Sequence, residues 1–286
     1  MIQNGNAGRT VFITGCSTGI GYCVAHGLKE KGYRVIASAR QVRDVGRLQQ
    51  EGLECLQLDL DQPESIQQAV QALADLSGRK IYGLFNNAGF GQPGAVEDLT
   101  RDVLRAQFET NVFGTLELTN RILPWMREAG EGRIIQNSSV LGFVSLAYRG
   151  AYNASKYALE GLYDTLRLEL ADTGIYPVLI EPGPIESRFR ANAFSAYKKH
   201  VDVHHSAHRA RYLAMEARLL KAGPAAPFTL PPEAVLDKVI AALSGRKPKP
   251  RYYVTFPTYL FGSLKRVLSS RALDRVLLKI SRGEQK

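Results

Sequence analysis

The stretch that decides the fold is TGCSTGIG at residues 14–21, which directly follows a short apolar run and directly precedes a helical pattern. Gly15 permits a sharp turn, Gly19 lets the backbone approach a pyrophosphate, and Gly21 lets helix and strand pack tightly. The first N–H groups of the helix then face the anion. This context predicts a dinucleotide-binding turn, although its spacing, G-x-x-x-G-x-G, differs from the commoner G-x-G-x-x-G. A turn without a ligand is the alternative.

Short apolar runs alternate with helix-length segments along most of the 286 residues, and Pro63 and Thr100 mark two helix starts. The alternation predicts an α/β fold, in which one doubly wound parallel sheet is covered by helices on both faces in a single domain. Such a fold binds its ligand beyond the carboxyl ends of the strands. Six runs are read as buried strands: residues 11–13, 34–38, 53–58, 82–85, 133–137 and 177–180.

Composition narrows the class of protein. The apolar content of 45% and the charged content of 22% are ordinary for a globular protein. The net charge of +10 is concentrated near the C-terminus without a recognition helix, zinc motif or stacking motif, so we predict no nucleic-acid partner. Three cysteines without paired spacing, no secretory signal and no long apolar run predict a cytoplasmic protein with reduced thiols.

The end of the second predicted strand distinguishes two forms of a cofactor. An acid about twenty residues after a glycine-rich turn usually binds the ribose 2′-hydroxyl of NAD. This chain instead has Ser38-Ala39-Arg40, and the Arg40 guanidinium can form a bidentate pair with a 2′-phosphate. We therefore predict NADP(H). A merely solvated Arg40 is the alternative, because Arg43 and Arg47 make the region basic in any case.

Two further strand ends carry groups suited to a cofactor. Asp59, followed by Leu60, offers a carboxylate to an adenine amino group. Asn87 offers side-chain bonds to neighbouring strands, and Gly89 beyond Ala88 allows a close approach. A structural and a cofactor-binding interpretation of this second turn overlap.

Tyr152 and Lys156 form a candidate proton-transfer pair. Residues four apart share a helix face, so the phenol and the ammonium lie about a turn apart. A fixed cation favours phenolate, so we expect Lys156 to lower the pKa of Tyr152 and allow proton exchange near neutral pH. An isolated Y-x-x-x-K is more often an ordinary surface pair, and only the accompanying motifs overturn that interpretation.

Three polar residues upstream complete the constellation. Ser138 and Ser139 end the fifth predicted strand, where a hydroxyl can donate to a substrate oxygen. Their side chains point to opposite faces, so at most one of them serves, and the pattern does not choose between them. Asn111 lies on a helix with Gly114 close by, an irregularity that can free a backbone carbonyl for water.

Taken together, these residues resemble the short-chain dehydrogenase/reductase family in its single-domain branch. The matches follow the family's order and cover about residues 9–184. The resemblance implies a Rossmann fold of about seven strands, with residues 251–255 as the seventh, and a homodimer or homotetramer. The matching positions are residues 14–21, residues 86–89, Asn111, Ser139, residues 152–156, Pro182 and Gly183.

The resemblance also implies roles for individual residues. The family's serine lies thirteen residues before its tyrosine, which selects Ser139. In similar proteins the tyrosine is the acid/base, the lysine lowers its pKa and holds the nicotinamide ribose, the serine positions the carbonyl, and the asparagine holds a water. Tyr152, Lys156, Ser139 and Asn111 match these roles. The implied cofactor contacts are Gly15, Ser17, Thr18, Gly19, Ile20, Arg40, Asp59, Leu60, Asn87, Ala88, Gly89, Tyr152, Lys156, Pro182, Gly183 and Ile185.

The implied reaction is hydride transfer between a nicotinamide and a carbonyl or alcohol, without a metal. Reduction of a hydrophobic aldehyde or ketone, steroid-, retinoid- or lipid-like, is the expected direction. Two rivals fit the same motifs. An epimerase or dehydratase of this fold usually carries a larger C-terminal domain than this chain has room for. A non-catalytic NADP(H) sensor or scaffold would be expected to have lost a catalytic group, and all four are present.

Residues 1–255 form the predicted cofactor-binding catalytic domain, in which residues 185–230 are too long for an ordinary sheet connection. We expect a substrate lid with helices of its own, whose apolar side chains either face a hydrophobic substrate or only pack the lid onto the core. His204 and His208 are spaced to share a helix face, but no second half of a zinc motif accompanies them, so we predict no metal site. The apolar candidates are Phe189, Phe194, Tyr197, Tyr212, Leu213, Met215 and Leu219.

Residues 256–286 form a basic, amphipathic tail. Gly262 and the pair Ser269-Ser270 are expected to break it into short helical pieces. Such a pattern can lie on an anionic membrane surface, which would make the protein membrane-peripheral. Alternatively, the apolar face of the tail closes the substrate pocket or a subunit interface, and the sequence leaves both open.

Overall fold

The computed structural model describes residues 8–220, 223 and 226–283. Its centre is a seven-stranded parallel sheet in the order β3-β2-β1-β4-β5-β6-β7. All seven predicted strands are present, and the predicted doubly wound fold is confirmed. The strands are β1 (Thr10–Ile13), β2 (Arg34–Ala39), β3 (Glu54–Gln57), β4 (Gly83–Asn86), β5 (Gly132–Asn137), β6 (Ile175–Glu181) and β7 (Arg251–Tyr253).

The strand order places the switch point of the sheet between β1 and β4. The chain builds outward from β1 through β2 to β3, returns to β4 beside β1, and then builds out the other way. Ile13 at the end of β1 pairs with Ala37 on β2 and with Phe85 on β4. Doubly wound folds bind ligands at this reversal, beyond the carboxyl ends of the strands. The glycine-rich turn and the turn at Asn87 both begin there.

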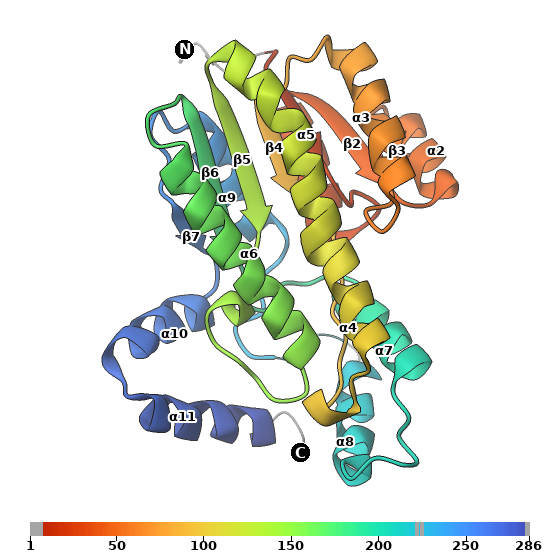
Figure 1. Ribbon diagram of the computed structural model, residues 1–286, viewed down its shortest axis with the longest axis vertical. Coiled ribbons are helices and arrows are strands. Elements are labelled where there is room, and N and C mark those ends of the chain that lie inside the picture. Colours follow the sequence, from red (N-terminus) through yellow and green to blue (C-terminus); the bar gives the residue numbers. More distant parts are fainter. Residues whose placement is uncertain (1–7, 221–222, 224–225, 284–286) are drawn as a thin grey trace.

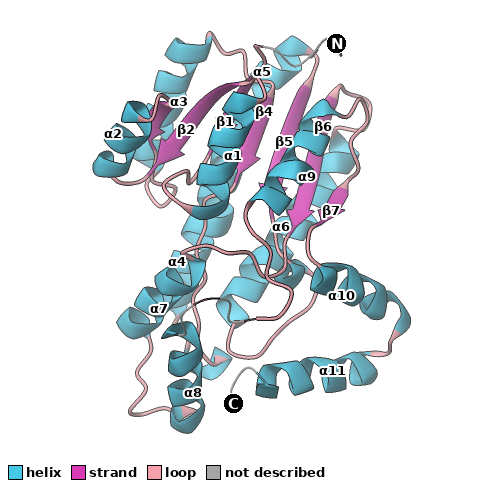
Figure 2. Ribbon diagram, turned by 180° about the vertical axis from the view of Figure 1, so that it is seen from behind, coloured by secondary structure: helices cyan, strands magenta, loops and turns pink. Residues whose placement is uncertain are grey.

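Helices cover the sheet on both faces. Val11 and Ile13 of β1 pack into the core under one helical layer, and Phe12 packs under the other, because successive strand side chains point to opposite faces. Burial on both faces explains why the strands are nearly continuous apolar runs. One layer contains α1 (Gly19–Glu30), α2 (Val42–Gln50) and α9 (Glu233–Ser244) (Figure 2), and the other contains α3 (Pro63–Ser77), α5 (Gly114–Ala129) and α6 (Gly150–Glu169) (Figure 1).

Two further groups of helices lie beyond the carboxyl ends of the strands, on opposite sides of the first half of α6 (Figures 1 and 2). The segment expected to form a lid supplies two helices of one group, and the tail forms the other group. The first group is α4 (Arg101–Phe108), α7 (Phe189–His200) and α8 (Arg209–Leu220), and the second is α10 (Phe256–Val267) and α11 (Ser270–Gly283).

The helix signals in the sequence are confirmed at three places. Pro63 begins α3, and the Thr100 side chain caps α4 by accepting from the Val103 N–H at 3.3 Å. The irregularity predicted at Asn111 is a π-helical turn, η2 (Glu109–Phe113), between α4 and α5. Two short 3₁₀ turns are η1 (Val96–Asp98) and η3 (Val140–Gly142).

Within residues 256–283, the tail breaks only at the serine pair, between α10 and α11. The break predicted at Gly262 is wrong, because Gly262 lies within α10. An added Cβ at Gly262 would stand 2.6 Å from a ring carbon of Tyr253, so this glycine serves close packing of the helix against β7. None of the helices in the described part of the chain is long and apolar enough to cross a membrane.

We expect Gly21→Ala to lower the melting temperature. Gly21 lies in the first turn of α1, where an added Cβ would stand 2.3 Å from the Gly15 oxygen. Relieving such overpacking typically costs about 1–3 kcal/mol. Gly46→Ala in α2 is the matched control, because an added Cβ there meets nothing within 4 Å. It should stabilise the protein by about 0.5–1 kcal/mol through helix propensity. Thermal unfolding followed by circular dichroism measures both, and changes of the same sign would contradict the packing role of Gly21.

Candidate active site

The glycine-rich turn between β1 and α1 has the backbone that its sequence predicts. Gly15 and Gly19 have φ angles of +71° and +62°, a region that other residues rarely adopt. Thr18 is the N-cap of α1, but its side chain makes no capping bond, and the first turn of α1 contains no acidic residue. The positive end of the helix is therefore not neutralised by a local carboxylate, which suits a phosphate group.

Thr14 and Asn87 tie the strand ends around this turn together. The buried Thr14 hydroxyl accepts from the Asn87 and Ala88 N–H groups at 3.0 and 2.9 Å. The Asn87 amide donates to the backbone oxygens of Thr14 and Gly15 at 3.0 and 3.1 Å, and its oxygen accepts from Asn137 at 3.0 Å. The bonds predicted for Asn87 are confirmed. The role of Thr14 was missed, although a hydroxyl directly after β1 at the switch point was the available signal.

Arg40 and Arg47 lie in the same region but differ in their side-chain contacts. Arg47 donates to the Ser17 carbonyl at 2.6 Å and pairs with Glu51 at 2.7 Å, so it braces the glycine-rich turn. Arg40 directly follows β2, is exposed, and makes no side-chain hydrogen bond or ion pair within the described residues. Its predicted pairing with a 2′-phosphate stays a prediction.

The turn after β3 fits its prediction less well. Asp59 is half-buried, and its Oδ1 already accepts from the Asp61 N–H at 3.2 Å. The Leu60 side chain is buried in the core layer that contains α3 and α5. The prediction that Leu60 contacts a cofactor can therefore hold only for its backbone, since its side chain packs on the other side.

The catalytic candidates Ser139 and Tyr152 meet at the carboxyl end of β5. The Ser139 hydroxyl lies close enough to the Tyr152 hydroxyl to lower its pKa. Ser138 points the other way and donates to the Glu160 carboxylate. The two serines thus face opposite sides of the strand, as predicted, and Ser139 is the one on the side of Tyr152.

Burial controls the pKa values of this pair of helical residues. It raises the pKa of Tyr152 to about 12, against the lowering effects of the Ser139 hydroxyl and the Arg149 charge. It lowers the pKa of Lys156 to about 8, against the opposing charge of Glu160. The expected lowering of the Tyr152 pKa by Lys156 is wrong for the protein alone, because desolvation dominates. The Lys156 ammonium donates to the Asn137 carbonyl at 2.7 Å and lies 5.6 Å from the centre of the Tyr152 ring.

Asn111 joins three elements near the same place. Its Oδ1 accepts from the Phe90 N–H at 3.1 Å, and its Nδ2 donates to the Phe90 carbonyl and to the Ser155 hydroxyl at 3.0 and 3.1 Å. An added Cβ at Gly89 would stand 3.1 Å from Asn111 Oδ1, so this glycine permits the approach. Asn111 therefore ties the π-helical turn to the β4 loop and to the residue before Lys156. The predicted water at Asn111 stays a prediction.

The start of the lid segment lies between the glycine-rich turn and Tyr152. An added Cβ at Gly19 would stand 3.0 Å from Ser187 Cβ, and one at Gly91 would stand 2.7 Å from the Phe189 ring. The Phe189 ring meets the Tyr152 ring edge-on at 5.2 Å between centres. Of the seven apolar candidates, Phe189 is the one with a ring contact to Tyr152. Five of the others pack together with Ala95 and Val201 in a cluster within the lid, and Leu213 is exposed. These five are Phe194, Tyr197, Tyr212, Met215 and Leu219.

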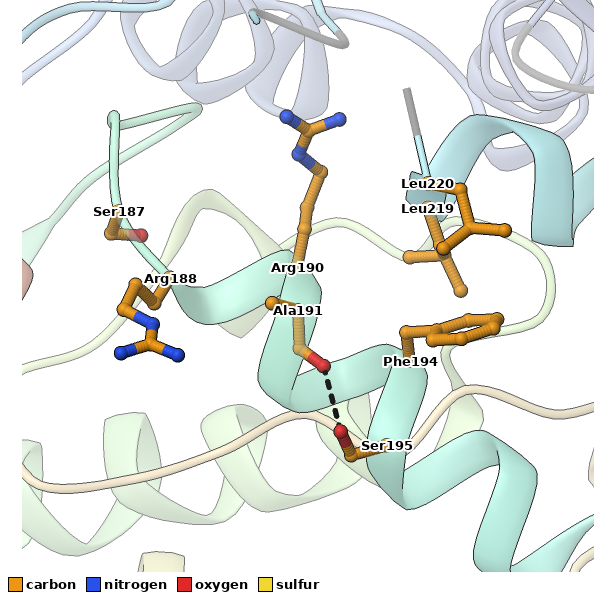
Figure 3. A pocket seen from close by; sticks show the side chains of 8 residues that line it. All are labelled: Ser187, Arg188, Arg190, Ala191, Phe194, Ser195, Leu219 and Leu220. Carbon is orange, nitrogen blue, oxygen red and sulfur yellow. Dashed lines mark hydrogen bonds between the residues drawn. The ribbon is translucent and has the colours of Figure 1, made fainter. Parts of the chain in front are cut away.

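A hollow of about 450 Å³ lies between the start of α7 and the end of α8 (Figure 3). Phe194, Leu219 and Leu220 border one side of it, and Ser187 and Arg188 border the other. Neither Tyr152 nor Ser139 lines it. This hollow therefore belongs to the lid segment and not to the catalytic centre.

The lid histidines do not share a helix face, so that expectation is wrong. Residues 201–208 connect α7 to α8 without a helix. His205 pairs with Asp202 at 2.7 Å, and His208 bonds to Glu97 and Tyr148, while His204 is exposed. Within the described residues, no three His, Cys, Asp or Glu side chains gather as a metal site would require.

A partly buried charge network behind the site was not predicted from the sequence. Arg251 on β7 donates to Glu181 at 3.0 Å, to Glu160 at 2.9 Å and to Asp164 at 2.6 Å. Glu160 also accepts from Ser138, so the network reaches the strand end that carries the catalytic serine. Glu160 lies four residues after Lys156 on α6, and this helical spacing was the available signal.

Comparison with known proteins identifies the family of this chain. Residues 9–198 match the short chain dehydrogenase family. The chain belongs to the short-chain dehydrogenase/reductase family. It is therefore an oxidoreductase of a family that binds nicotinamide cofactors, and its Rossmann-type fold is the family's fold.

Similar proteins span nearly the whole chain. The uncharacterized oxidoreductase YbbO of Escherichia coli K12 is 44% identical over 269 residues, which is 94% of each chain. The NADPH-dependent 3-dehydrocapnine reductase of Ornithobacterium rhinotracheale is 31% identical and covers 95% of this chain and 96% of its own. Human 17-beta-hydroxysteroid dehydrogenase type 1 is 33% identical and covers 86% of this chain and 77% of its own. A crystal structure of a short-chain dehydrogenase from Streptomyces avermitilis has a TM-score of 0.76 at 29% identity, covering 97% of this chain and 99% of that one.

We expect Glu181→Gln to stabilise the protein more at pH 8 than at pH 5. Burial and the neighbouring Glu160 raise the pKa of Glu181 far above its usual value, although Arg251 opposes the shift. The folded protein therefore keeps a proton that the unfolded chain loses above about pH 4.3. Its stability falls as the pH rises through this window, and a neutral amide removes the fall. Melting temperatures at the two pH values measure the effect.

Asp164→Asn is the matched control, because Asp164 also bonds to Arg251. Against the effect of burial, hydrogen bonds from Arg251 and Arg167 lower its pKa, so its contribution is already complete at pH 5. The loss from Asp164→Asn should be equal at both pH values. A gain from Glu181→Gln that does not grow with pH would contradict a protonated Glu181.

Proposed function

We propose that this oxidoreductase is an NADP(H)-dependent reductase of hydrophobic aldehydes or ketones, steroid-, retinoid- or lipid-like, with Tyr152 as the acid/base. The observation that carries the proposal is the Ser139 hydroxyl beside the Tyr152 hydroxyl, among apolar side chains. Two relatives support it by name, one as an NADPH-dependent reductase and one as a hydroxysteroid dehydrogenase.

The residues at the switch point fit a dinucleotide. Gly15 and Gly19, with their positive φ angles, shape a turn at the start of α1 that suits a pyrophosphate, and the exposed Arg40 suits a 2′-phosphate. Residues 87 and 88 bond to Thr14 in the same region, and residues 182–185 lead to Ser187, which lies against Gly19. Lys156 is the candidate partner of the nicotinamide ribose. The nicotinamide, when bound, supplies or accepts the hydride.

Side chains of the protein then transfer the proton to the substrate oxygen. With its pKa raised to about 12, the Tyr152 phenol keeps its proton at neutral pH and is ready to donate it to a developing alkoxide. Ser139 can hold the same substrate oxygen, because its hydroxyl already meets that of Tyr152. Lys156, with a pKa of about 8, is mostly charged at neutral pH and stabilises the phenolate that the transfer leaves. The bond to the Asn137 carbonyl fixes its ammonium.

The surroundings of Tyr152 support an apolar substrate. On one side lies the Phe189 ring. On the other, Tyr152 packs against a cluster that contains Leu141, Val144 and Leu277, the last from α11. We propose that residues 185–230 act as the substrate lid, because their first residues already lie over both halves of the site.

We further propose that the protein works in the cytoplasm, as a homodimer or homotetramer. Cys16, Cys23 and Cys55 are free thiols, which suits a reducing compartment. The oligomer rests on the family membership alone.

The reductase proposal predicts consumption of NADPH with at least one hydrophobic carbonyl compound. A panel of aldehydes, ketones, steroids and retinoids is followed by the absorbance of NADPH. Tyr152→Phe should lower kcat about 100- to 10,000-fold, because it removes the proton that the alkoxide accepts. An unchanged melting temperature shows that the variant is folded. NADPH binding without turnover of any compound would favour the sensor, and an unaffected Tyr152→Phe variant would remove Tyr152 from the mechanism.

The cofactor preference is tested separately by Arg40→Asp. Replacing a guanidinium that pairs with a phosphate by a carboxylate should weaken NADPH binding by at least about ten-fold, because a charge-assisted bond is lost and a repulsion is added. NADH binding should change little. Fluorescence titration with both cofactors measures the ratio, and Arg43→Asp, at an exposed neighbour, is the control. Equal losses for NADPH and NADH would refute the role of Arg40.

A further inference from the structure

The outer face of α10 carries large apolar side chains that remain exposed. Phe256, Leu260 and Val267 are 55%, 40% and 81% exposed, and their spacing places them on one side of the helix. Tyr259 beside them is 50% exposed. Phe228 is 57% exposed and extends the patch, with its ring 4.9 Å from that of Phe256. Contiguous apolar patches of this kind mark interaction sites.

The outer face of α11 is basic instead. Arg271, Arg275, Lys279 and Arg282 follow one another at intervals of four, four and three residues, so they form a stripe along one side of the helix, and all four are exposed. Leu278 lies in this stripe and is 50% exposed. The tail thus presents apolar side chains on one helix and positive charge on the next.

Both outer faces point away from the same internal cluster. Phe261 of α10 and Leu277 of α11 are buried together with Leu141 and Val144 beside the catalytic helix. Phe143 stacks on Tyr253, against which Gly262 packs closely. In both views α10 and α11 lie at the edge of the molecule, joined by a short turn (Figures 1 and 2). Because their inner faces share one cluster, the apolar stripe of α10 and the basic stripe of α11 lie on neighbouring helices at one edge of the molecule.

We propose that this outer surface of α10 and α11 binds an anionic lipid membrane. Side chains such as Phe256 and Leu260 enter the boundary between headgroups and acyl chains, while the basic stripe meets lipid phosphates and carboxylates. Charge decides the occupant. A second copy of this chain would place one basic stripe against another, at a net charge of +10 on each chain, whereas an anionic bilayer complements it.

The surface differs from the arrangement usual for an amphipathic tail. The apolar face of α11 is already packed on the protein's own core through Leu273, Val276 and Ile280. Docking therefore uses a preformed surface and requires no detachment of the tail. Lipid contact comes from the outer side chains of α10, and α11 contributes charge. The proposal does not depend on the reaction catalysed.

The test is sedimentation of the full-length protein with vesicles. One set contains equal parts of phosphatidylserine and phosphatidylcholine, and the other contains phosphatidylcholine alone. Binding is expected to the first set only and to weaken as salt is added. The double variant Arg271→Gln, Arg275→Gln should bind about twenty-five-fold less tightly, since each basic side chain near an anionic surface contributes roughly five-fold. Leu260→Asp combined with Val267→Asp should bind more weakly still.

The matched control is Leu168→Asp on α6, which replaces a side chain that is 69% exposed but lies outside the patch. It should bind as the parent does. The replaced side chains are exposed, so we expect unchanged melting temperatures. Such values show that all variants are folded. Equal sedimentation with both vesicle sets, or undiminished binding of the Leu260→Asp, Val267→Asp variant, would overturn the proposal. A change of oligomeric mass in that variant, without loss of vesicle binding, would make the surface a subunit contact and overturn it as well.

Discussion

Asn137 at the end of β5 donates from its side-chain amide to Asn87 and accepts on its backbone carbonyl from Lys156, at 3.0 and 2.7 Å. Asn87 in turn holds the backbone of Thr14 and Gly15, where the glycine-rich turn begins. One residue therefore fixes the catalytic amine relative to the cofactor turn. These bonds are buried or partly buried, so each broken partner would leave an unpaired polar group at a real cost. The relative placement of the two halves depends on this junction.

Behind the junction, a charge network opposes part of the effect that burial has on the pKa of Lys156. Lys156 is 5% exposed, and its ammonium is retained through the Asn137 carbonyl and the nearby Glu160. Glu160 accepts a hydrogen bond from Arg251, which also donates to Glu181 at the end of β6. Such a network seldom adds net stability, because desolvation offsets the attraction. Its consequence here is placement, since it fixes α6, β6 and β7 around the end of β5 and sets the charge that Lys156 experiences.

The sequence predicted well what local spacing determines and poorly what depends on the fold. Strand positions, the backbone of Gly15 and Gly19, and the shared helix of Tyr152 and Lys156 follow from periodicity and glycine conformation. The pKa of Tyr152 could not be predicted in this way, because it depends on desolvation by side chains distant in sequence. The same holds for Gly262, whose neighbour Tyr253 lies on another element. The sequence pattern did not show whether Ser138 or Ser139 faces Tyr152. The hydrogen bond from Ser138 to Glu160 decides this, because it turns Ser138 to the other side of the strand.

The tail shows why an amphipathic pattern alone does not name its partner. Periodicity says only that one face of a helix avoids water. On α11 that face meets the protein's own core beside Tyr152. On α10 the inner face reaches the same cluster through Phe261, but Phe256, Leu260 and Val267 stay exposed on the outer face. Only tertiary contacts separate these cases. Because both helices share a cluster with the catalytic tyrosine, the wall of the site and the outer surface are two sides of one structural unit.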